Sequence, residues 1–333
     1  MIKVKLQSGV GGCSILNVQY AFFTADCLHS QYQSKGSDSF SLWQHTKAMG
    51  DKPSKCAEAP LLDEPWRQIN WGKDKQRDLH YMKNFKHRTE GQQLRILLHG
   101  PPGAGKSSFI NSVQSVLLGR MYTLALAANI AHECFTKQYS TYEIQKENPE
   151  TFYPFVFNDT RGLSQHRGVL ADDVKLALRG HVKDGYMFNP ESKLSEGNEF
   201  YNKSPTVNDK VHVLVCIVPA DTLSSMSDKT VQKLRDIRLE ASRLGIPQVT
   251  VLTKVEEACP EIKRDLKNVY RSINLKEKMQ KFSADVGIPM NCIFPVRNYY
   301  EEIDLYDDTD TLILSAMRRI IDHGEDFINR KTV

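Results

Sequence analysis

Short apolar runs alternate with segments of helical periodicity along most of the chain. Buried strands are predicted for the apolar runs at 94–98, 153–158, 211–219, 248–252 and 292–296, and an edge strand for the β-favouring stretch at 138–145. Apolar residues three and four positions apart predict helices at about 72–88, 107–118, 170–178, 227–244, 261–282 and 311–327. The sequence therefore predicts an α/β fold, with a mostly parallel sheet, one antiparallel edge strand and helices on both faces.

Some segments do not follow this alternation. Residues 1–60 are rich in Ser, Gln, Gly and His without a sustained apolar period, and we leave them as an unassigned N-terminal extension. Residues 61–92 are predicted to form a lead-in helical segment ahead of the main domain at 93–333. The polar stretch at 185–210 is longer than a connection requires, which makes it a candidate functional insertion.

The lead-in segment carries two tryptophans and a basic run. Trp66 and Trp71 are interpreted as residues that seal a core, since aromatic residues beside a helix are usually buried. The basic run at 73–88 also holds Asp74 and Asp78, so we expect a solvated helix face and not a nucleic-acid patch.

The composition is that of a globular protein, since 40% of the 333 residues are hydrophobic and 25% are charged. A formal net charge of +4 is too small to indicate a dedicated nucleic-acid-binding protein, and we expect no such partner. The seven cysteines include no C-x-x-C pair, which favours reduced thiols over a disulfide framework or a zinc site. Because no apolar run approaches the roughly 20 residues that cross a bilayer, and no secretion signal is evident, we expect a cytoplasmic protein without a transmembrane segment.

The strongest motif is a glycine loop between the predicted strand at 94–98 and the helix after it. The pattern G-x-x-x-x-G-K-[ST] is completed by Gly100, Gly105, Lys106 and Ser107. Glycines let the backbone turn its amides toward a diphosphate at the positive end of a helix, lysine neutralises phosphate charge, and the serine hydroxyl ligates Mg²⁺. The residues predicted to contact the nucleotide here are Gly100, Gly103, Ala104, Gly105, Lys106, Ser107 and Ser108.

The alternative interpretation is a glycine- and proline-rich turn with a solvated lysine. Average residue frequencies produce the bare pattern by chance in roughly one chain in a hundred of this length. The flanking strand and helix make a chance match rarer still, so the phosphate loop is the favoured interpretation.

A second motif follows the predicted strand at 153–158. Asp159-Thr160-Arg161-Gly162 places a carboxylate where it can hold the water shell of Mg²⁺ and a glycine amide where it can sense a γ-phosphate. Two fixed residues mean little in isolation, but their position downstream of a phosphate loop makes the motif informative. Ser107 and Asp159 are accordingly predicted to hold the metal.

The strand at 248–252 ends in Thr253-Lys254-Val255-Glu256-Glu257. Guanine offers two hydrogen-bond donors that one carboxylate can accept together, while a lysine stem covers the ring. Guanine-nucleotide switches use [NT]-K-x-D for this purpose, and Glu256 stands here in place of the aspartate. We therefore predict that Thr253, Lys254 and Glu256 read the base of GTP or GDP, with Glu257 as the alternative carboxylate.

From about Trp66 to Arg330 the chain resembles the interferon-induced protein 44 family of GTPase-like proteins. The resemblance rests on PWR, LLHGPPGAGKSSFINSVQS, FTKQY, DTRGL, FNP, VLTKVE and LILSAMRRI. It implies a Ras-like P-loop NTPase fold, a cytoplasmic location, and induction in innate immune and antiviral responses. It also implies that Thr136 is a switch threonine whose hydroxyl reaches Mg²⁺, although a threonine entering a strand is an equally ordinary interpretation.

Hydrolysis of GTP is expected to be slow. Efficient GTPases carry a polar residue directly after D-x-x-G to orient the attacking water, and this chain has Leu163 there. Gln165 and His166 are the candidate substitutes, although exposed polar loop residues are common. Arg161 or Arg167 would have to act across a homodimer, or an unidentified protein partner would have to supply the missing group.

Three functions remain open at this point. The first is a guanine-nucleotide switch or slow GTPase whose nucleotide state reorganises 134–142 and 159–168 for a protein partner. The second is an ATP-dependent enzyme on the same loop, which the T-K-x-E sequence disfavours. The third is an interaction scaffold in which Glu256 and Leu163 mark decay of the nucleotide site.

Overall fold

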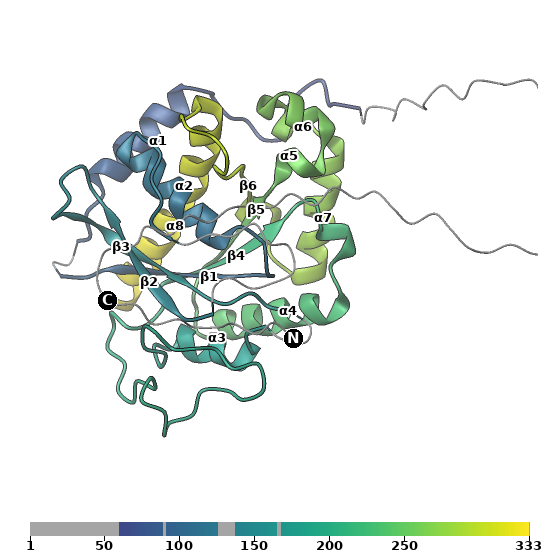
Figure 1. The fold of residues 1–333 in the computed structure, drawn as a ribbon. Coiled ribbons are helices and arrows are strands. Elements are labelled where there is room, and N and C mark those ends of the chain that lie inside the picture. Colours follow the sequence, from purple (N-terminus) through teal and green to yellow (C-terminus); the bar gives the residue numbers. More distant parts are fainter. Residues whose placement is uncertain (1–59, 89–90, 126–136, 165–167, 333) are drawn as a thin grey trace, which may run out of the picture. The chain divides into compact units, whose positions relative to one another are not determined.

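A six-stranded sheet forms the core of the fold in the computed structural model (Figure 1). The structure describes residues 60–88, 91–125, 137–164 and 168–332. Its strands are β1 (Leu94–His99), β2 (Ser140–Gln145), β3 (Phe152–Asp159), β4 (Val213–Pro219), β5 (Gln248–Thr253) and β6 (Ile293–Pro295). The spatial order is β2-β3-β1-β4-β5-β6, and every pair is parallel except β2 with β3. This topology confirms the predicted Ras-like P-loop architecture, including its antiparallel edge strand.

The parallel register brings the carboxyl ends of the central strands to one edge of the sheet. Leu98 of β1 lies opposite Asp159 of β3, and His99 lies opposite Cys216 of β4. Residues that follow these strands therefore meet at this edge, where ligands bind in open α/β sheets.

Three helices cover one face of the sheet: α1 (Lys73–Asn84), α2 (Lys106–Leu118) and α8 (Asp307–Thr332). In β1, Ile96 and Leu98 point to this face while Leu97 points to the other, as the two-residue period of a strand requires. All three side chains are fully buried. Burial on both sides explains why the parallel strands read as continuous apolar runs.

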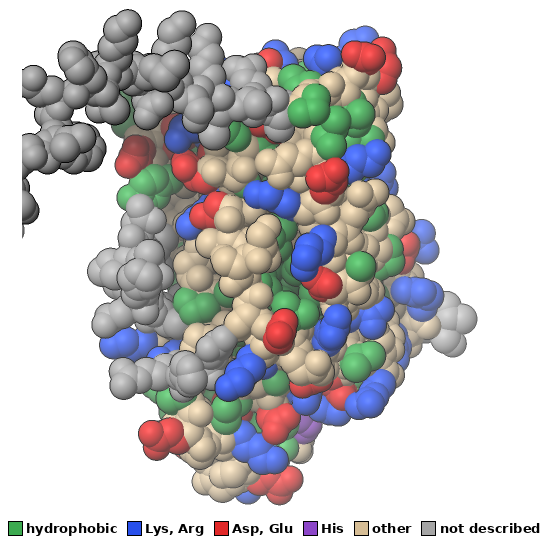
Figure 2. Space-filling view, turned by 90° about the vertical axis from the view of Figure 1, so that its right-hand side faces the viewer, with side chains coloured by type: hydrophobic (Ala, Val, Ile, Leu, Met, Phe, Trp, Pro, Cys, Tyr) green, Lys and Arg blue, Asp and Glu red, His purple; other side chains and the backbone are tan. Residues whose placement is uncertain are grey.

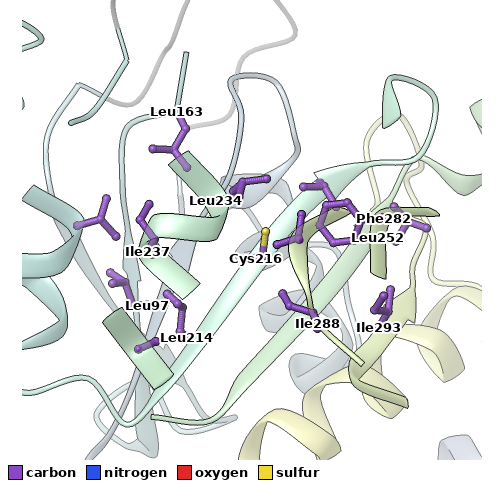
Figure 3. Packing of buried hydrophobic residues seen from close by; sticks show 14 of the residues in the cluster. Leu97, Leu163, Leu214, Cys216, Leu234, Ile237, Leu252, Phe282, Ile288 and Ile293 are labelled. Carbon is purple, nitrogen blue, oxygen red and sulfur yellow. The ribbon is translucent and has the colours of Figure 1, made fainter. Parts of the chain in front are cut away.

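The opposite face is covered by α3 (Ala171–Leu178), α4 (Asp228–Arg243) and α7 (Ile273–Val286). Figure 3 shows Leu234 and Ile237 of α4 against Leu214 and Cys216 of β4. The remaining helices are short and lie in connections: α5 (Val255–Ala258), α6 (Pro260–Arg264) and the 3₁₀ turns Leu223–Ser225, Leu266–Tyr270 and Met290–Cys292.

The predicted helix at 261–282 is wrong as a single element. The backbone of Asp265 is extended, with φ −147°, and its side chain accepts a hydrogen bond from the amide of Lys267. Ser272 then caps α7 by accepting from the amide of Leu275. These local caps break the helix, whereas the apolar spacing continues because the segments on both sides of the break pack into one core cluster.

The expectation of a solvated face on the lead-in helix is also wrong at one position. Asp78 is only 1% exposed and forms ion pairs with Arg77 and Arg318, because α1 packs along α8. The helix ends at Asn84, short of the predicted 88. Trp66 does seal a core as predicted, with its ring edge-on to Tyr270 at 5.1 Å.

The stretch at 185–210 contains no helix or strand, in agreement with its polar sequence. Isolated bridges between Gln138 and Met187, and between Val182 and Tyr201, fix it to the domain. The first bridge also accounts for the edge strand, which begins at Ser140 and not at 138.

Surface charge is mixed on the described part of the face in Figure 2, where basic and acidic side chains are interspersed. None of the helices in the described residues combines the length and the apolar character that a membrane crossing requires.

Candidate functional site

The loop that joins β1 to α2 forms the centre of the site. Gly103 and Gly105 adopt left-handed backbone conformations, with φ of 67° and 83°. Gly105 is the N-cap of α2, which begins at Lys106, so the first turn of a 13-residue helix faces the loop. The loop therefore has the backbone form that directs amides and a positive helix end toward an anion.

Two glycines allow the loop to pack closely against its neighbours. A Cβ atom on Gly100 would lie 1.9 Å from the carbonyl oxygen of Ile217, and one on Gly162 would lie 2.6 Å from Cα of Pro102. The amide of Leu163 also donates a 2.9 Å hydrogen bond to the carbonyl of Gly100. The D-T-R-G segment and the phosphate loop are thus in direct backbone contact.

Lys106 is 6% exposed, and its ammonium group donates to the carbonyl of Pro101 at 3.3 Å. Burial lowers the pKa of neighbouring His99 to about 3, with the charge of Lys106 acting in the same direction. Burial raises the pKa of Cys216 to about 12, against the opposing effect of Lys106. Both neighbours are uncharged near neutral pH, so neither offsets the positive charge at the loop.

The hydroxyl of Ser107 donates a 2.6 Å hydrogen bond to Asp159, whose side chain is fully buried. Thr160 fixes the end of β3 through a hydrogen bond from its hydroxyl to the carbonyl of Leu98. The sequence-predicted metal residues Ser107 and Asp159 therefore lie together. In the part of the chain that the structure describes, no cluster of three His, Cys, Asp or Glu residues forms a separate metal cage.

The turn after β5 is attached to the phosphate loop and carries backbone strain. The hydroxyl of Thr253 donates to the carbonyl of Ala104 at 2.7 Å. Lys254 has φ 55° and is the one non-glycine residue with positive φ among those described. A left-handed backbone at a non-glycine residue is unfavourable, and such strain concentrates at functional sites.

The two candidate carboxylates on this turn differ in their surroundings. Glu256 is partly buried, and its Oε2 atom is buried without a hydrogen-bond partner in the described structure. Burial raises the pKa of Glu256 to about 6, opposed in part by a hydrogen bond from its own backbone amide and by the charge of Arg297. Glu257 is exposed and lies 3.6 Å from the ammonium of Lys263. Glu256 is thus the carboxylate with unused hydrogen-bonding capacity.

Sequence reasoning missed the residues after β6. The side-chain amide of Asn298 donates to the carbonyl of Gly105 at 3.1 Å, while its Oδ1 atom is buried without a partner in the described residues. The amide of Tyr299 donates to the hydroxyl of Ser112 in α2. The position of Asn298 could have identified it as a site residue, because polar residues directly after a parallel strand lie at the ligand edge of the sheet.

The side chains of other residues singled out in the sequence point away from the loop, or the residues lie outside the described ranges. Leu163 is fully buried and points into the core in Figure 3. Arg161 donates to the carbonyl of Phe188 in the 185–210 stretch. The residues outside the described ranges are Thr136, Gln165, His166 and Arg167.

Solved structures with a similar arrangement are distant in sequence. Toc33 from Arabidopsis thaliana, solved with GDP and Mg²⁺, is 12% identical with a TM-score of 0.43, over 76% of this chain and 93% of that protein. A GTP-binding protein from Sulfolobus solfataricus, solved with GDP, is 15% identical with a TM-score of 0.34, over 70% of this chain and 52% of that protein.

Sequence comparison identifies nearer relatives, although no protein-family model matches the chain. Interferon-induced protein 44 from Pan troglodytes and from Homo sapiens are each 34% identical over 238 residues, which is 71% of this chain and 53% of each relative. Human interferon-induced protein 44-like is 29% identical over 71% of this chain and 52% of that protein. The chain thus spans about half the length of the curated relatives it matches. By these similarities, the chain belongs to the interferon-induced protein 44 family.

Proposed function

We propose that this chain binds a guanine nucleotide with Mg²⁺ and acts as a nucleotide-dependent switch, or a slow GTPase, in a cytoplasmic antiviral response. The observation that carries the proposal is the hydrogen bond between Ser107 and Asp159. A hydroxyl and a carboxylate beside a phosphate loop are the oxygen ligands by which P-loop proteins hold magnesium on a nucleotide. The names of the relatives support induction by interferon.

The residues present fit the metal and the phosphates. Ser107 would ligate Mg²⁺ directly, Asp159 would hold its water shell, and Lys106 would neutralise the phosphates. The ion itself, when bound, would neutralise charge on the phosphates. Burial of Lys106 and Asp159 strengthens both effects, since charges in a water-poor site are screened less.

Glu256 supports a preference for guanine. Its buried, unpartnered oxygen is the type of acceptor that the N1 and exocyclic amine hydrogens of guanine would satisfy. Adenine offers no pair of donors at these positions, and an unsatisfied buried carboxylate is costly. The ion pair of Glu257 with Lys263 leaves Glu256 as the proposed base reader.

Slow turnover follows from the position of Leu163. Its side chain is buried in the core and apolar, so it cannot orient an attacking water. We expect unaided hydrolysis on the order of 10⁻⁴ s⁻¹, the rate of Ras alone, or slower. A protein partner that supplies an arginine would raise that rate by about 10³- to 10⁵-fold.

The test is a titration of the purified chain with fluorescent GTP and ATP analogues, with and without Mg²⁺. We expect GTP to bind more tightly than ATP, and Mg²⁺ to tighten GTP binding. A preference for ATP would support the ATP-dependent enzyme, and no binding of either would support the scaffold. Lys106→Ala should weaken binding by about 100-fold, because a charge-assisted phosphate contact is lost. Lys175→Ala is the matched control, since Lys175 lies on α3 and pairs with Asp172.

A further inference from the structure

The loop between β6 and α8 presents apolar side chains to solvent. Tyr300, Ile303 and Tyr306 are 61%, 86% and 55% exposed. Single exposed apolar residues are ordinary, but three within seven positions form a local apolar surface. We call residues 300–308, with the sequence YEEIDLYDD, the acidic loop, because it holds five acidic residues and no basic one. Three of the five pair with basic residues of the same molecule, so most of the negative charge offered to a partner comes from Glu301 and Asp304.

The acidic loop is held in one conformation at both ends. The hydroxyl of buried Tyr299 accepts a hydrogen bond from the amide of Tyr306 at 2.7 Å and lies 2.7 Å from Asp310. The carboxylate of Glu302 accepts from the amides of Tyr300 and Glu301 at 2.8 and 3.1 Å. A loop fixed in this way loses little further entropy when it binds, which favours recognition.

A complementary hollow lies at the far end of α8. This cavity, of about 720 Å³, has an apolar floor and a basic rim. We call it the basic groove. The described residues that line it include no aspartate or glutamate, and those that matter here are Val207, Ile246, Phe327, Arg179, Lys210 and Lys331.

Two features keep the basic groove open to a partner. Val207, from the 185–210 stretch, is 65% exposed although it lines an apolar floor. Lys210 and Lys331 are also exposed, and Lys331 lies over the ring of Phe327 at 5.5 Å. Glu240 partly neutralises Arg179, so most of the positive charge of the rim comes from the two lysines.

The acidic loop cannot enter the basic groove of its own molecule. The loop ends where α8 begins, at Asp307, and the groove is lined by Phe327 and Lys331 near the end of that helix, toward the C-terminus marked in Figure 1. The 20 or so helical residues between them span about 30 Å. A straight helix therefore separates the two surfaces, and they can meet only between molecules.

We propose that the acidic loop of one molecule docks into the basic groove of a second copy, giving a head-to-tail contact. Ile303 and the two tyrosines cover the apolar floor, while Glu301 and Asp304 face Lys210 and Lys331. Because the two contacting surfaces differ, the assembly either closes into a ring or grows as a chain. This contact uses none of the residues of the phosphate loop or of the turn after β5, although the acidic loop begins directly after Asn298 and Tyr299.

The experiment is sedimentation velocity of the whole chain over a concentration series. The variants are Ile303→Lys on the loop, Val207→Glu in the groove, and Leu239→Glu, an exposed apolar position on α4, as control. We expect wild type and Leu239→Glu to form the same concentration-dependent oligomers. Each of the other two variants should weaken association by at least about tenfold, since it places a like charge in the contact. All three positions are exposed, so thermal unfolding should be unchanged.

Mixing the two variants tests directly whether the loop of one molecule binds the groove of another. The Ile303→Lys molecule keeps an intact groove and the Val207→Glu molecule keeps an intact loop, so an equimolar mixture should regain association, to a 1:1 dimer at least. No dimer in the mixture would overturn the head-to-tail contact. Wild type that stays monomeric at about 100 μM, or oligomers that survive either single change, would overturn it as well.

Discussion

The Oγ atom of Ser107 lies 2.6 Å from a carboxylate oxygen of Asp159, across 52 residues of sequence. The first residue belongs to α2 and the second ends β3, so one hydrogen bond joins the two motifs that the sequence predicted to hold a metal. If this pair holds Mg²⁺ as proposed, neutralising the carboxylate should remove the effect of Mg²⁺ on nucleotide affinity.

Asp159→Asn is expected to abolish the effect of Mg²⁺ on GDP affinity while leaving metal-free binding nearly unchanged. Asparagine preserves the shape and still accepts from Ser107, but it lacks the charge that holds the water shell of the ion. The expected loss is about 10- to 100-fold in the Mg²⁺-dependent part of the affinity. Isothermal titration with GDP, with Mg²⁺ or with EDTA, measures it. Asp172→Asn, at an exposed position on α3, is the control, and full metal dependence in Asp159→Asn would contradict the assignment.

Glu256→Gln tests base recognition. The change removes a charged acceptor from the base, and we expect GTP affinity to fall about 10- to 100-fold, as for loss of a hydrogen bond to a charged group. Inosine triphosphate, which lacks the exocyclic amine, should bind wild type more weakly than GTP. In the variant this difference between the two nucleotides should be smaller, because the glutamine oxygen accepts only as a neutral group. Competition titrations of both nucleotides against wild type and the variant give the four affinities that this comparison needs. Glu257→Gln should behave as wild type, and the opposite pattern would transfer the role to Glu257.

The same residue predicts a pH-dependent cost to stability without nucleotide. Burial raises the pKa of Glu256 to about 6, so the folded state disfavours its ionised form. Protonation of Glu256 therefore contributes to the free energy of unfolding. This contribution is fully present below the ordinary pKa of 4.5 and is lost as the pH rises through 6. Glu256→Gln should therefore stabilise the nucleotide-free chain at pH 7.5 by up to about 2 kcal/mol, and by nothing near pH 4. Urea unfolding at the two pH values measures this, and an equal effect at both would contradict it.

Gly162→Ala tests the contact between the D-T-R-G segment and the phosphate loop. The new methyl group would lie 2.6 Å from the backbone of Pro102, so one of the two loops must move. We expect a destabilisation of about 1–3 kcal/mol, typical of overpacking, together with weaker nucleotide binding. Gly197→Ala is the matched control, because a Cβ atom there meets nothing within 4 Å. Thermal unfolding of both variants compares them, and similar melting temperatures would show that the loops are not in such contact.

Local patterns predicted the strands, and the order of strand, glycine loop and helix, well, because each depends on residues close together in sequence. The run ending at Leu98 and the glycines after it fix a strand and a turn by their own chemistry. The break at Asp265 was not predicted because side-chain caps overrode a continuous apolar period. The spacing of apolar residues does not predict such caps.

Long-range relationships account for the rest of what the sequence did not predict. Asn298 reaches Gly105 across 193 residues, and only the sheet order brings them together. The acidic loop and the basic groove likewise have ordinary sequences, and their complementarity depends on the length and direction of α8. The same limit applies to Asp78, which a local pattern places on a polar helix face.

Asp78→Ala is expected to destabilise the chain by about 1–3 kcal/mol. The carboxylate lies at the junction of α1 and α8, 2.8 Å from the guanidinium of Arg77 and 3.0 Å from that of Arg318. Both arginines are partly exposed and regain water when the partner is lost, so the cost stays below the 3–5 kcal/mol of a fully buried pair. Urea unfolding measures the change, with Asp172→Ala as an exposed control. A difference from wild type below about 0.5 kcal/mol would mean that the ion pairs of Asp78 add little to the attachment of α1 to α8, which then depends on apolar packing and on contacts such as Lys75 with Asp310.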